Sequence, residues 1–266
     1  MNWKLTVEYD GTRYYGWQEQ KGARTVAGEI RGAAEAFLDY PAEVFGAGRT
    51  DAGVHALAQV ARLRSARRLR PRELLHGLND RLPPDINILR VEEASDKFDP
   101  RRDAIARYYL YQISTRRTAF AKKAVWWVKD RLDVEAMQQA CNRLVGRYDF
   151  ARFCDKRAGE RSTIVVVEHA ELGREGDLIL FRIGASHFLW KMVRRITGAL
   201  VEVGRGQLRP DDFQALFDST SVKRETASFD TAAHTAPPSG LFLERVIYQG
   251  ETRPGALVPA LAVQHV

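Results

Sequence analysis

The 266-residue sequence predicts an α+β protein built from two similar subdomains, and three observations support this fold class. Runs in which apolar and polar residues alternate, as in half-buried strands, occur in both halves of the chain. Between them lie stretches whose apolar residues recur at helical spacing. In each half the order is strand, helix, strand, strand, which favours mainly antiparallel sheets with helices packed on them.

The first half begins with a strand over 3–9, in which Trp3, Leu5 and Val7 alternate with polar residues. Asp10-Gly11 ends this strand, because such a dipeptide favours a turn. The further elements predicted in this half are a helix over 26–38, strands over 43–47 and 59–64, a short helix over 72–78 and a strand over 86–91. The first subdomain is therefore placed at residues 1–105.

The second half repeats this order. It begins with a strand over 108–113, and Asp133 is a good N-cap for a helix that Gly146 closes. The further elements predicted are strands over 163–172 and 178–183 with a turn at 174–177, a helix running from Phe188 to Gly204, and a strand over 241–248. We place the second subdomain at 106–250. The extension 251–266 has no clear period and is expected to be loose or to lie on another surface.

The charge of the chain favours a polyanionic partner. Lys plus Arg number 41 against 34 for Asp plus Glu, so the net charge is +7 and the pI about 9.5. A basic but inert surface would have the same composition. Four basic clusters are present: Arg67, Arg68 and Arg70; Arg101, Arg102 and Arg107; Arg116 and Arg117; Lys191, Arg194 and Arg195. Arginine binds phosphate through its planar fork and stacks on bases, so these clusters favour RNA or DNA.

Other classes are disfavoured by what the sequence lacks. Cys141 and Cys154 are the two cysteines, without a CxxC motif or histidines at ligand spacing, which argues against a zinc site or a disulfide scaffold. No apolar run approaches a membrane span, and the N-terminus has no signal-peptide pattern. We therefore expect a soluble, cytoplasmic protein that does not contact a membrane.

The most informative stretch is Gly-Arg-Thr-Asp-Ala-Gly-Val-His at Gly48–His55. Its glycines let the backbone turn sharply and bring the Asp51 side chain close to a ligand, while Arg49 favours the charged form of that carboxylate. An ionised carboxylate of this kind acts as a nucleophile, a base or a metal ligand. A phosphate-binding P-loop is excluded, because no Gly-Lys-Ser/Thr follows the glycines.

A second stretch, Tyr9–Gln18, combines aromatic residues, an arginine and glycines in a short loop. Such a loop either packs as an aromatic turn or contacts nucleic acid through aromatic faces that stack on bases. The side chains available for that contact are Arg13, Tyr15 and Trp17.

Two stretches in the second half carry similar residues. Arg107–Tyr111 places tyrosines on a strand beside an arginine, where they either join a core or form a platform for a base. Phe188–Arg195 forms the apolar face of a helix, and Arg194 lies on or near that face. A partly buried arginine needs an anionic partner, and Asp51 is a natural candidate.

With these motifs the chain resembles the tRNA pseudouridine synthase A (TruA) family, from Val7 to about Tyr248. The motifs that carry the resemblance are Tyr-Asp-Gly…Tyr-Gly-Trp-Gln at Tyr9–Gln18, the signature at Gly48–His55, Leu-Asn-x-x-Leu-Pro at Leu78–Pro83, Arg-Tyr-x-Tyr within Arg107–Tyr111, Phe-Leu-x-x-Met-Val-Arg at Phe188–Arg194 and Gly-Leu-x-Leu at Gly240–Leu243.

The chain departs from the family pattern in three places. Lys191 stands where the family often has a histidine, and Phe-Asp-Pro-Arg at Phe98–Arg101 replaces Phe-His/Asp-Ala-Arg. The register of Tyr-x-Tyr is ambiguous by one residue. The spacing from Phe98 favours Tyr109 over Tyr108 as the tyrosine of the motif.

The resemblance implies the pseudouridine synthase fold, with two ferredoxin-like or RRM-like subdomains joined across a basic active-site cleft. It implies an isomerase, of the intramolecular transferase kind, that converts uridine to pseudouridine at positions thirty-eight to forty of the tRNA anticodon stem-loop. The implied reaction uses no cofactor and no metal. The implied partners are the anticodon arm of tRNA and a second copy of the chain in a homodimer.

The resemblance also implies roles for particular residues. Asp51 attacks C1′ of a flipped-out uridine or stabilises positive charge there, and Arg194 pairs with Asp51. Tyr109 stacks on the uracil and is a candidate for removing the C5 proton. Arg49 holds the RNA open or fills the space of the flipped base. The further side chains expected to bind the substrate are Arg107, Arg13, Tyr15 and Trp17.

Two other classes of function are weighed against this one. A pure RNA-binding module without catalysis is opposed by the intact Asp51. A metal-dependent phosphodiesterase needs a second carboxylate ligand, and no acidic cluster surrounds Asp51 in the sequence.

Overall fold

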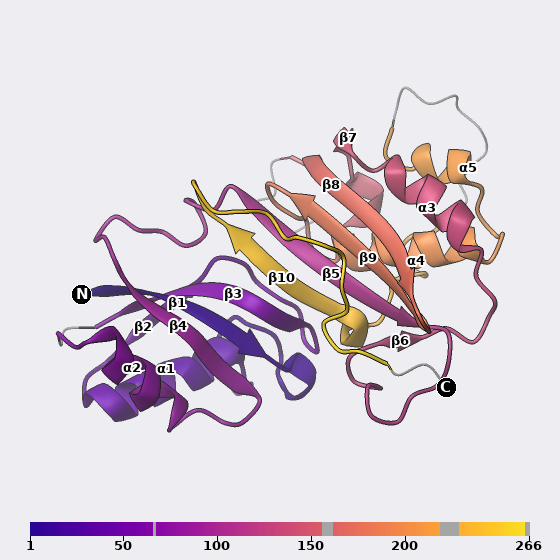
Figure 1. The fold of residues 1–266 in the computed structure, drawn as a ribbon. Helices are drawn as coiled ribbons and strands as arrows, with labels where there is room; N and C mark the ends of the chain where they lie inside the picture. Colours follow the sequence, from indigo (N-terminus) through magenta and orange to yellow (C-terminus); the bar gives the residue numbers. More distant parts are fainter. Residues whose placement is uncertain (66–67, 156–161, 219–228, 264–266) are drawn as a thin grey trace. The chain divides into compact units, whose positions relative to one another are not determined.

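The computed structural model describes residues 1–65, 68–155, 162–218 and 229–263 (Figure 1). The chain forms two compact units. The first comprises Met1–Ile105 and Phe242–Arg253, and the second comprises Ala106–Leu241 and Pro254–Val266. Both units are mixed α+β with mainly antiparallel sheets, which confirms the predicted fold class.

The sheet of the first unit has the strand order β4-β1-β3-β10, with β2 paired to β3. Its strands are β1 (Asn2–Tyr9), β2 (Glu43–Gly46), β3 (His55–Arg64), β4 (Ile86–Ala94) and β10 (Leu241–Ile247). β1 is antiparallel to β3 and β4, whereas β10 runs parallel to β3. The alternation that predicted β1 is a core pattern, because Trp3, Leu5 and Val7 are fully buried.

Two helices complete the first unit: α1 (Val26–Leu38) and α2 (Pro71–Asn79). Thr25 caps α1, where its side chain accepts a hydrogen bond from the backbone N–H of Gly28. The helices pack closely at Gly77, where a Cβ atom would lie 2.3 Å from the ring of Phe37. A short 3₁₀ helix, η1 (Gly11–Arg13), follows β1.

The sheet of the second unit has the order β5-β9-β8-β7 and is antiparallel throughout this order. Its strands are β5 (Ala106–Ser114), β6 (Trp126–Trp127), β7 (Gly146–Asp149), β8 (Ile164–Glu175) and β9 (Leu178–Ala185). β6 pairs in parallel with the last two residues of β5. β9 is buried along its whole length, so the core of this unit is centred on β9.

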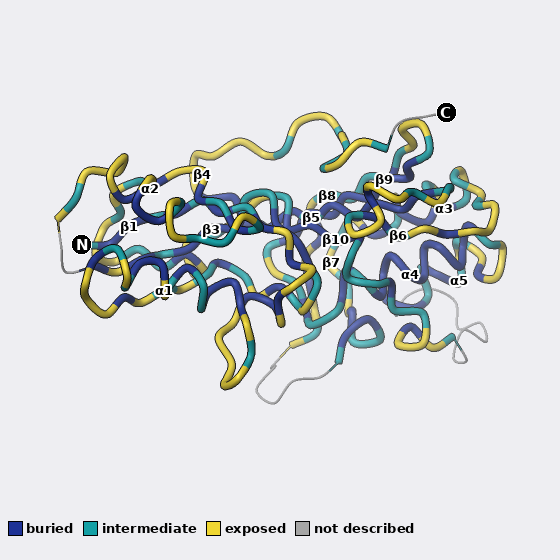
Figure 2. The backbone as a smooth tube through the Cα atoms, turned by 90° about the horizontal axis from the view of Figure 1, so that it is seen from below, coloured by how far each residue is buried: buried dark blue, intermediate teal, exposed yellow. Residues whose placement is uncertain are grey.

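The helices of the second unit are α3 (Val134–Asn142), α4 (Met192–Gly204) and α5 (Pro210–Gln214), with 3₁₀ turns η2 (Ala151–Phe153) and η4 (Pro238–Gly240). α3 packs on α4 and on β8. Figure 2 shows that α4 is buried along almost all of its length, as expected for a helix at the centre of a helical layer.

Residues 254–263 of the C-terminal extension lie on the sheet of the second unit, in line with one of the two predicted alternatives (Figure 1). Arg182 on β9 donates hydrogen bonds to the backbone oxygens of Gly255 and Ala256. The side-chain oxygen of Gln112 on β5 accepts from the backbone N–H of Ala260 at 2.6 Å. The extension therefore satisfies two polar side chains that the sheet buries.

Several boundaries differ from those predicted from the sequence. Phe242–Arg253 belongs to the first unit, because β10 pairs with β3, whereas the prediction placed 106–250 in one subdomain. The helix expected to end at Gly146 ends at Asn142, and Gly146, with φ 141°, begins β7. The helix expected from Phe188 begins at Met192, after Lys191 in the left-handed region. The sequence patterns did not predict the short elements β6, β7 and α5.

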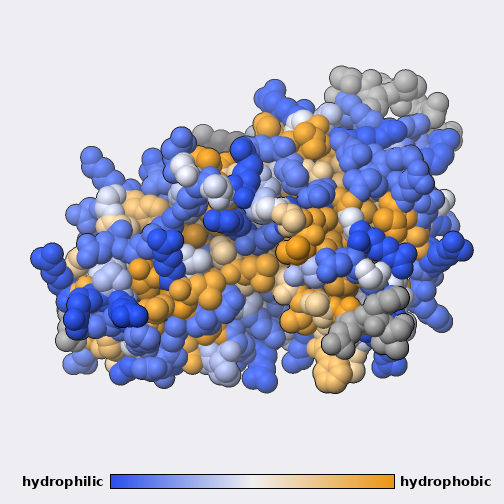
Figure 3. Space-filling model, in the orientation of Figure 1, coloured by the Kyte–Doolittle hydropathy of each residue, from blue (hydrophilic) through white to orange (hydrophobic). Residues whose placement is uncertain are grey.

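The exposed residues are mainly hydrophilic, as expected when the apolar side chains form the core. Hydrophilic residues cover most of the face drawn in Figure 3, interrupted by smaller apolar areas. Within the described part of the chain, no helix has the length and apolar character needed to cross a bilayer.

Candidate active site

The loop that carries Asp51 connects β2 to β3 and is fixed by neutral hydrogen bonds. The hydroxyl groups of Tyr9 and Thr50 lie 2.7 Å apart and share a hydrogen bond. The side-chain amide of Gln59 donates to the backbone oxygen of Gly48 at 3.0 Å. The N–H of Val54 donates to the oxygen of Asp51 and closes a turn around the carboxylate-bearing residue.

A second loop, residues 10–17, packs directly on the Asp51 loop through the backbone. The N–H of Trp17 donates to the oxygen of Thr50 at 3.1 Å, and the N–H of Gly53 donates to the oxygen of Tyr14 at 3.3 Å. Two glycines make this approach possible. A Cβ at Gly11 would lie 1.9 Å from the oxygen of Val54, and one at Gly16 would lie 2.5 Å from the oxygen of Thr50.

His55, the last residue of the motif, completes the junction of the two loops. Its side chain is 3% exposed and stacks on Phe242, with ring centroids 4.8 Å apart. Its Nδ1 accepts a hydrogen bond from the N–H of Gly11 at 3.1 Å. The Tyr-Asp-Gly motif at the end of β1 therefore supports the Asp51 loop, a relation that sequence reasoning missed because it depends on contact between distant segments.

The functional side chains of the first unit are accessible. Asp51 is half-buried, and Arg49 is exposed without an ion pair or hydrogen bond to any residue that the structure describes. Arg13 is also exposed, and 66% of Tyr15 is exposed. These residues have the exposure that contact with RNA requires.

Trp17 does not have this exposure, so the structure corrects the prediction that it contacts the substrate. It is 2% exposed, and its indole lies under Gly46, where a Cβ would be 2.4 Å from the indole nitrogen. Its ring also packs near Tyr9, with centroids 6.0 Å apart. Trp17 belongs to the core beneath the Asp51 loop.

In the second unit, two neighbouring tyrosines of β5 differ in their environment. Tyr108 is 2% exposed and covers Gly184, where a Cβ would lie 2.4 Å from its ring. Tyr109 points to the other face of the strand, is half-buried, and meets Phe188 edge-on with centroids 5.0 Å apart. Of the two tyrosines, Tyr109 has the ring that a ligand can reach.

Arg194 lies in the first turn of α4 and is anchored to a crossing segment. Its Nε donates to the backbone oxygen of Ala236 at 2.7 Å, and the N–H of Ala236 donates to the oxygen of Arg194. Nearby, the hydroxyl of Tyr111 donates to the oxygen of Pro237. Burial raises the pKa of Tyr111, although the positive charge of Arg194 opposes this, so Tyr111 is a neutral donor with a structural role.

The other two members of the Arg194 cluster are paired internally, contrary to the prediction that this cluster binds a polyanion. Lys191 contacts Asp155 at 2.7 Å, and Arg195, which is 5% exposed, forms an ion pair with the same carboxylate. Hydrogen bonds from Lys191 and Arg195 lower the pKa of Asp155. Asp155 therefore neutralises these cations.

Arg107 is also largely buried, with 9% of it exposed, and this opposes its predicted role in binding the substrate. Its Nη1 donates to the backbone oxygen of Ser186 at 2.8 Å, beyond the end of β9. Asp51 belongs to the first unit and Arg194 to the second, and their pairing stays a prediction. Arg67, from the first basic cluster, lies outside the described residues.

Metal ligands do not cluster in the parts of the chain that the structure covers. There, no group of three or more His, Cys, Asp or Glu side chains is arranged to hold a metal ion. Both cysteines are buried and unpaired with each other, and burial raises the pKa of the Cys141 thiol to about 12.

Comparison with known proteins adds the following similarities. A family model described as "tRNA pseudouridine synthase" matches residues 5–101 and 140–249. Proteins named tRNA pseudouridine synthase A from Brucella ovis, Brucella canis and Brucella suis are each 39% identical over 251 residues, covering 92% of this chain and 97% of the relative. A chain in a solved structure entitled "Crystal Structure of a Cbf5-Nop10-Gar1 Complex" is 12% identical with a TM-score of 0.31, over 74% of this chain and 54% of that one.

Proposed function

Because the chain belongs to the tRNA pseudouridine synthase family, we propose that it isomerises uridine to pseudouridine in the anticodon stem-loop of tRNA, with Asp51 as the nucleophile. The protein is an isomerase. The target positions within the stem-loop are thirty-eight to forty. The observation that carries this proposal is an accessible carboxylate on a loop held by two packed glycines of a second loop.

The reaction accounts for the residue types at this site. The N1–C1′ bond of uridine breaks, the uracil turns, and C5 bonds to C1′ while the C5 proton is lost and N1 gains one. A carboxylate at C1′ either forms a transient ester or stabilises the positive charge that develops there. The conversion involves no net oxidation, reduction or hydrolysis, so we propose that it uses neither cofactor nor metal.

The target uridine must leave the helical stack before a carboxylate can reach C1′. Arg49 is suited to fill the vacated space or hold the RNA open, because it is exposed and forms no hydrogen bond or ion pair with the other described side chains. Arg13 and Tyr15, both exposed, are suited to contact the adjoining RNA backbone and bases.

Tyr109 is the residue we propose to stack on the extruded uracil and to remove the C5 proton. Its ring is half-buried and packs against Phe188, whereas the ring of Tyr108 is buried and packs on Gly184. Arg194 is proposed to pair with Asp51 and to maintain its negative charge. The hydrogen bond from Arg194 to the backbone oxygen of Ala236 limits the mobility of the guanidinium group, which suits this role.

We also propose that the protein acts in the cytoplasm as a homodimer in which each tRNA touches both subunits. The support for this is the family resemblance. Sedimentation equilibrium with and without tRNA would test the dimer, and cell fractionation would test the location.

The deciding experiment measures tritium release from tRNA labelled at C5 of uridine. Asp51→Asn should abolish release while tRNA affinity stays within a few fold of wild type, because the amide keeps the shape and loses the nucleophile. Residual turnover would refute the nucleophile assignment. Cleavage of the tRNA strand that a chelator abolishes would favour a metal-dependent phosphodiesterase. Binding of tRNA by the wild-type protein without tritium release would favour a binding module.

A further inference from the structure

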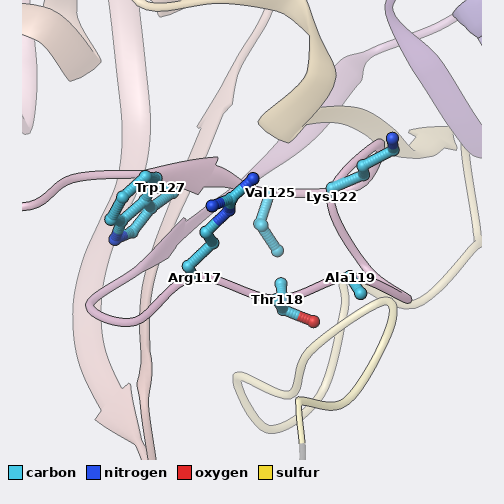
Figure 4. Close-up of a pocket in the computed structure, with 6 residues that line it drawn as sticks. All are labelled: Arg117, Thr118, Ala119, Lys122, Val125 and Trp127. Carbon is cyan, nitrogen blue, oxygen red and sulfur yellow. The ribbon is translucent and has the colours of Figure 1, made fainter.

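The third basic cluster, Arg116–Arg117, has no part in the proposed reaction, yet the structure places Arg117 in a cavity of the second unit. The cavity has a volume of ≈ 570 Å³. Its lining, drawn in Figure 4, consists of Arg117, Thr118, Ala119, Lys122, Val125 and Trp127. The volume is in the range of pockets that bind small ligands.

The lining combines positive charge with one flat ring. In Figure 4 the side chain of Arg117 lies beside Trp127, and Lys122 lies across the cavity from them. No acidic residue lines the cavity. Among the described residues, neither Arg117 nor Lys122 forms an ion pair, whereas the neighbouring Arg116 contacts Asp177 at 2.9 Å. The lining therefore includes two uncompensated cations, which favour the approach of an anion.

Trp127 is held in place by its backbone and leaves its side chain available. β6 pairs with β5 so that Trp127 is the partner of Ser114, and the N–H of Val128 donates to the oxygen of Ser114 at 3.0 Å. Even so, 43% of Trp127 is exposed. An exposed indole on a fixed strand is a preorganised surface on which a base can stack.

The segment that precedes β6 is fixed in the same way. The side-chain amide of Gln112 donates to the oxygen of Ala124, and the N–H of Ala121 donates to the hydroxyl oxygen of Thr118. Phe120, in the same segment, is fully exposed. Basic residues interleaved with exposed aromatic ones are typical of surfaces that bind single-stranded nucleic acid.

The cavity is separate from the position of Tyr109. Trp127 pairs with Ser114, five residues along β5 from Tyr109, a distance of about 17 Å at the usual rise of a strand. Residues an odd number apart on a strand point to opposite faces, so the Ser114–Trp127 pair and Tyr109 lie on different faces of the sheet. The uridine that stacks on Tyr109 cannot occupy the cavity as well.

We propose that this cavity binds an unpaired nucleotide of the tRNA other than the target uridine, with its base on Trp127 and its phosphate between Arg117 and Lys122. The proposal rests on tRNA being the substrate. It assigns to the cavity a binding role that adds affinity for tRNA and takes no part in the chemistry.

The test measures the Kd of tRNA in an Asp51→Asn background, so that no turnover occurs, and kcat and KM in the wild-type background. Trp127→Ala and Arg117→Gln should each weaken tRNA binding about tenfold, the size expected for one stacked base or one charge-assisted phosphate contact. KM should rise by a similar factor while kcat at saturating tRNA stays unchanged. Trp127→Phe, which keeps an aromatic face, should restore most of the affinity.

Lys129→Gln is the matched control, because it removes an exposed positive charge two residues from Trp127 and outside the cavity lining. It should change the Kd less than twofold. Thermal melting of each variant shows whether the fold is intact. Equal losses for Lys129→Gln and Arg117→Gln would overturn the proposal in favour of a diffuse charge effect, and unchanged binding by a folded Trp127→Ala variant would also overturn it.

Uridine monophosphate is the second probe. Quenching of tryptophan fluorescence that is present in wild type and absent in Trp127→Phe would report a nucleotide on Trp127. If that quenching occurs while Trp127→Ala leaves tRNA affinity intact, the cavity is a mononucleotide site and the RNA proposal fails. If Trp127→Ala weakens tRNA binding but the wild-type protein releases no tritium, the proposed reaction fails and the cavity's role in binding RNA stands.

Discussion

The loop that carries Asp51 and the helix that carries Arg194 are positioned by different kinds of interaction. Around Asp51 the supports are neutral: backbone hydrogen bonds, a Tyr9–Thr50 hydroxyl pair and glycines in van der Waals contact. Around Arg194 they include ion pairs, since Asp155 joins both residues that flank the start of the helix, Lys191 and Arg195. High salt should therefore weaken the support of the helix more than that of the loop.

This difference suits the two groups chemically. Asp51 must present an anion, and the neutral hydrogen bonds that fix its loop leave Arg194 to supply the positive charge in the proposed reaction. Arg194 sits in a row of cations, Lys191, Arg194 and Arg195, which would repel each other at the N-terminus of a helix. Asp155 removes that repulsion and leaves Arg194 as the member not engaged by this carboxylate.

The largest effect is expected where the loop depends on close contact. Gly11→Ala places a methyl group 1.9 Å from the oxygen of Val54, so the two loops must separate. We expect a loss of about 1–3 kcal/mol in the free energy of unfolding and a fall in kcat/KM of about a hundredfold or more. Urea denaturation and the tritium-release assay measure these two quantities.

Gly32→Ala is the control for that substitution. Gly32 lies within α1 and a Cβ there would meet nothing within 4 Å, so alanine should be neutral or stabilise the helix by up to about 1 kcal/mol. A Gly11→Ala variant as active and stable as Gly32→Ala would contradict the view that backbone contact fixes Asp51.

A smaller effect, confined to turnover, is expected on β5. Tyr109→Phe keeps the ring against Phe188 and removes the hydroxyl, so proton removal from C5 should slow by about a hundredfold while stability and tRNA binding hold. Tyr108→Phe removes the hydroxyl of a buried ring and should leave kcat within a few fold. If Tyr108→Phe is the damaging change, Tyr108 is the tyrosine of the family motif, and the half-buried ring of Tyr109 does not take part in the reaction.

Comparison of the two regions also shows what local sequence can predict. Alternation was sufficient for β1 because all its apolar positions face one core. Trp17 and Arg107 were assigned to the substrate because their residue types suit RNA, yet both are buried by partners far away in sequence: Gly46 in one case and Ser186 in the other. Residue type states what a side chain can bind, whereas its exposure depends on tertiary packing.

The same limit applies to the supports of both regions. The pattern Tyr-Asp-Gly marked a turn after β1, but only the fold shows that Gly11 is needed because Val54 passes beside it. Similarly, no local signal connects Asp155 to Arg195, which lies 40 residues further along the chain. Such contacts become visible in a sequence only through motifs learned from relatives.

The smallest expected effect tests the ionic support of the helix. Asp155→Asn leaves Lys191 and the buried Arg195 without their carboxylate. Because Asp155 is partly exposed, water screens the pair, and the loss in the free energy of unfolding at neutral pH should be about 1 kcal/mol or less. We expect kcat/KM to fall by a few fold, because the loss of the carboxylate shifts the position of Arg194. The control is Asp230→Asn, which removes an exposed carboxylate elsewhere in this unit and should leave kcat/KM unchanged.

A sharper test is the pH dependence of the difference in the free energy of unfolding between wild type and Asp155→Asn. The pKa of Asp155 is lowered in the folded protein from its usual 3.8, so its contribution is fully present above that pH and disappears as the pH falls through the lowered value. Wild type and Asp155→Asn should therefore differ in stability at pH 7 and converge as the pH falls below the lowered pKa of Asp155. High salt at pH 7 should also reduce the difference in the free energy of unfolding between wild type and Asp155→Asn. The corresponding difference between wild type and Gly11→Ala should persist in high salt, because salt does not screen a steric clash. If salt changed these two differences in the free energy of unfolding equally, the loop and the helix would be held by the same kind of interaction.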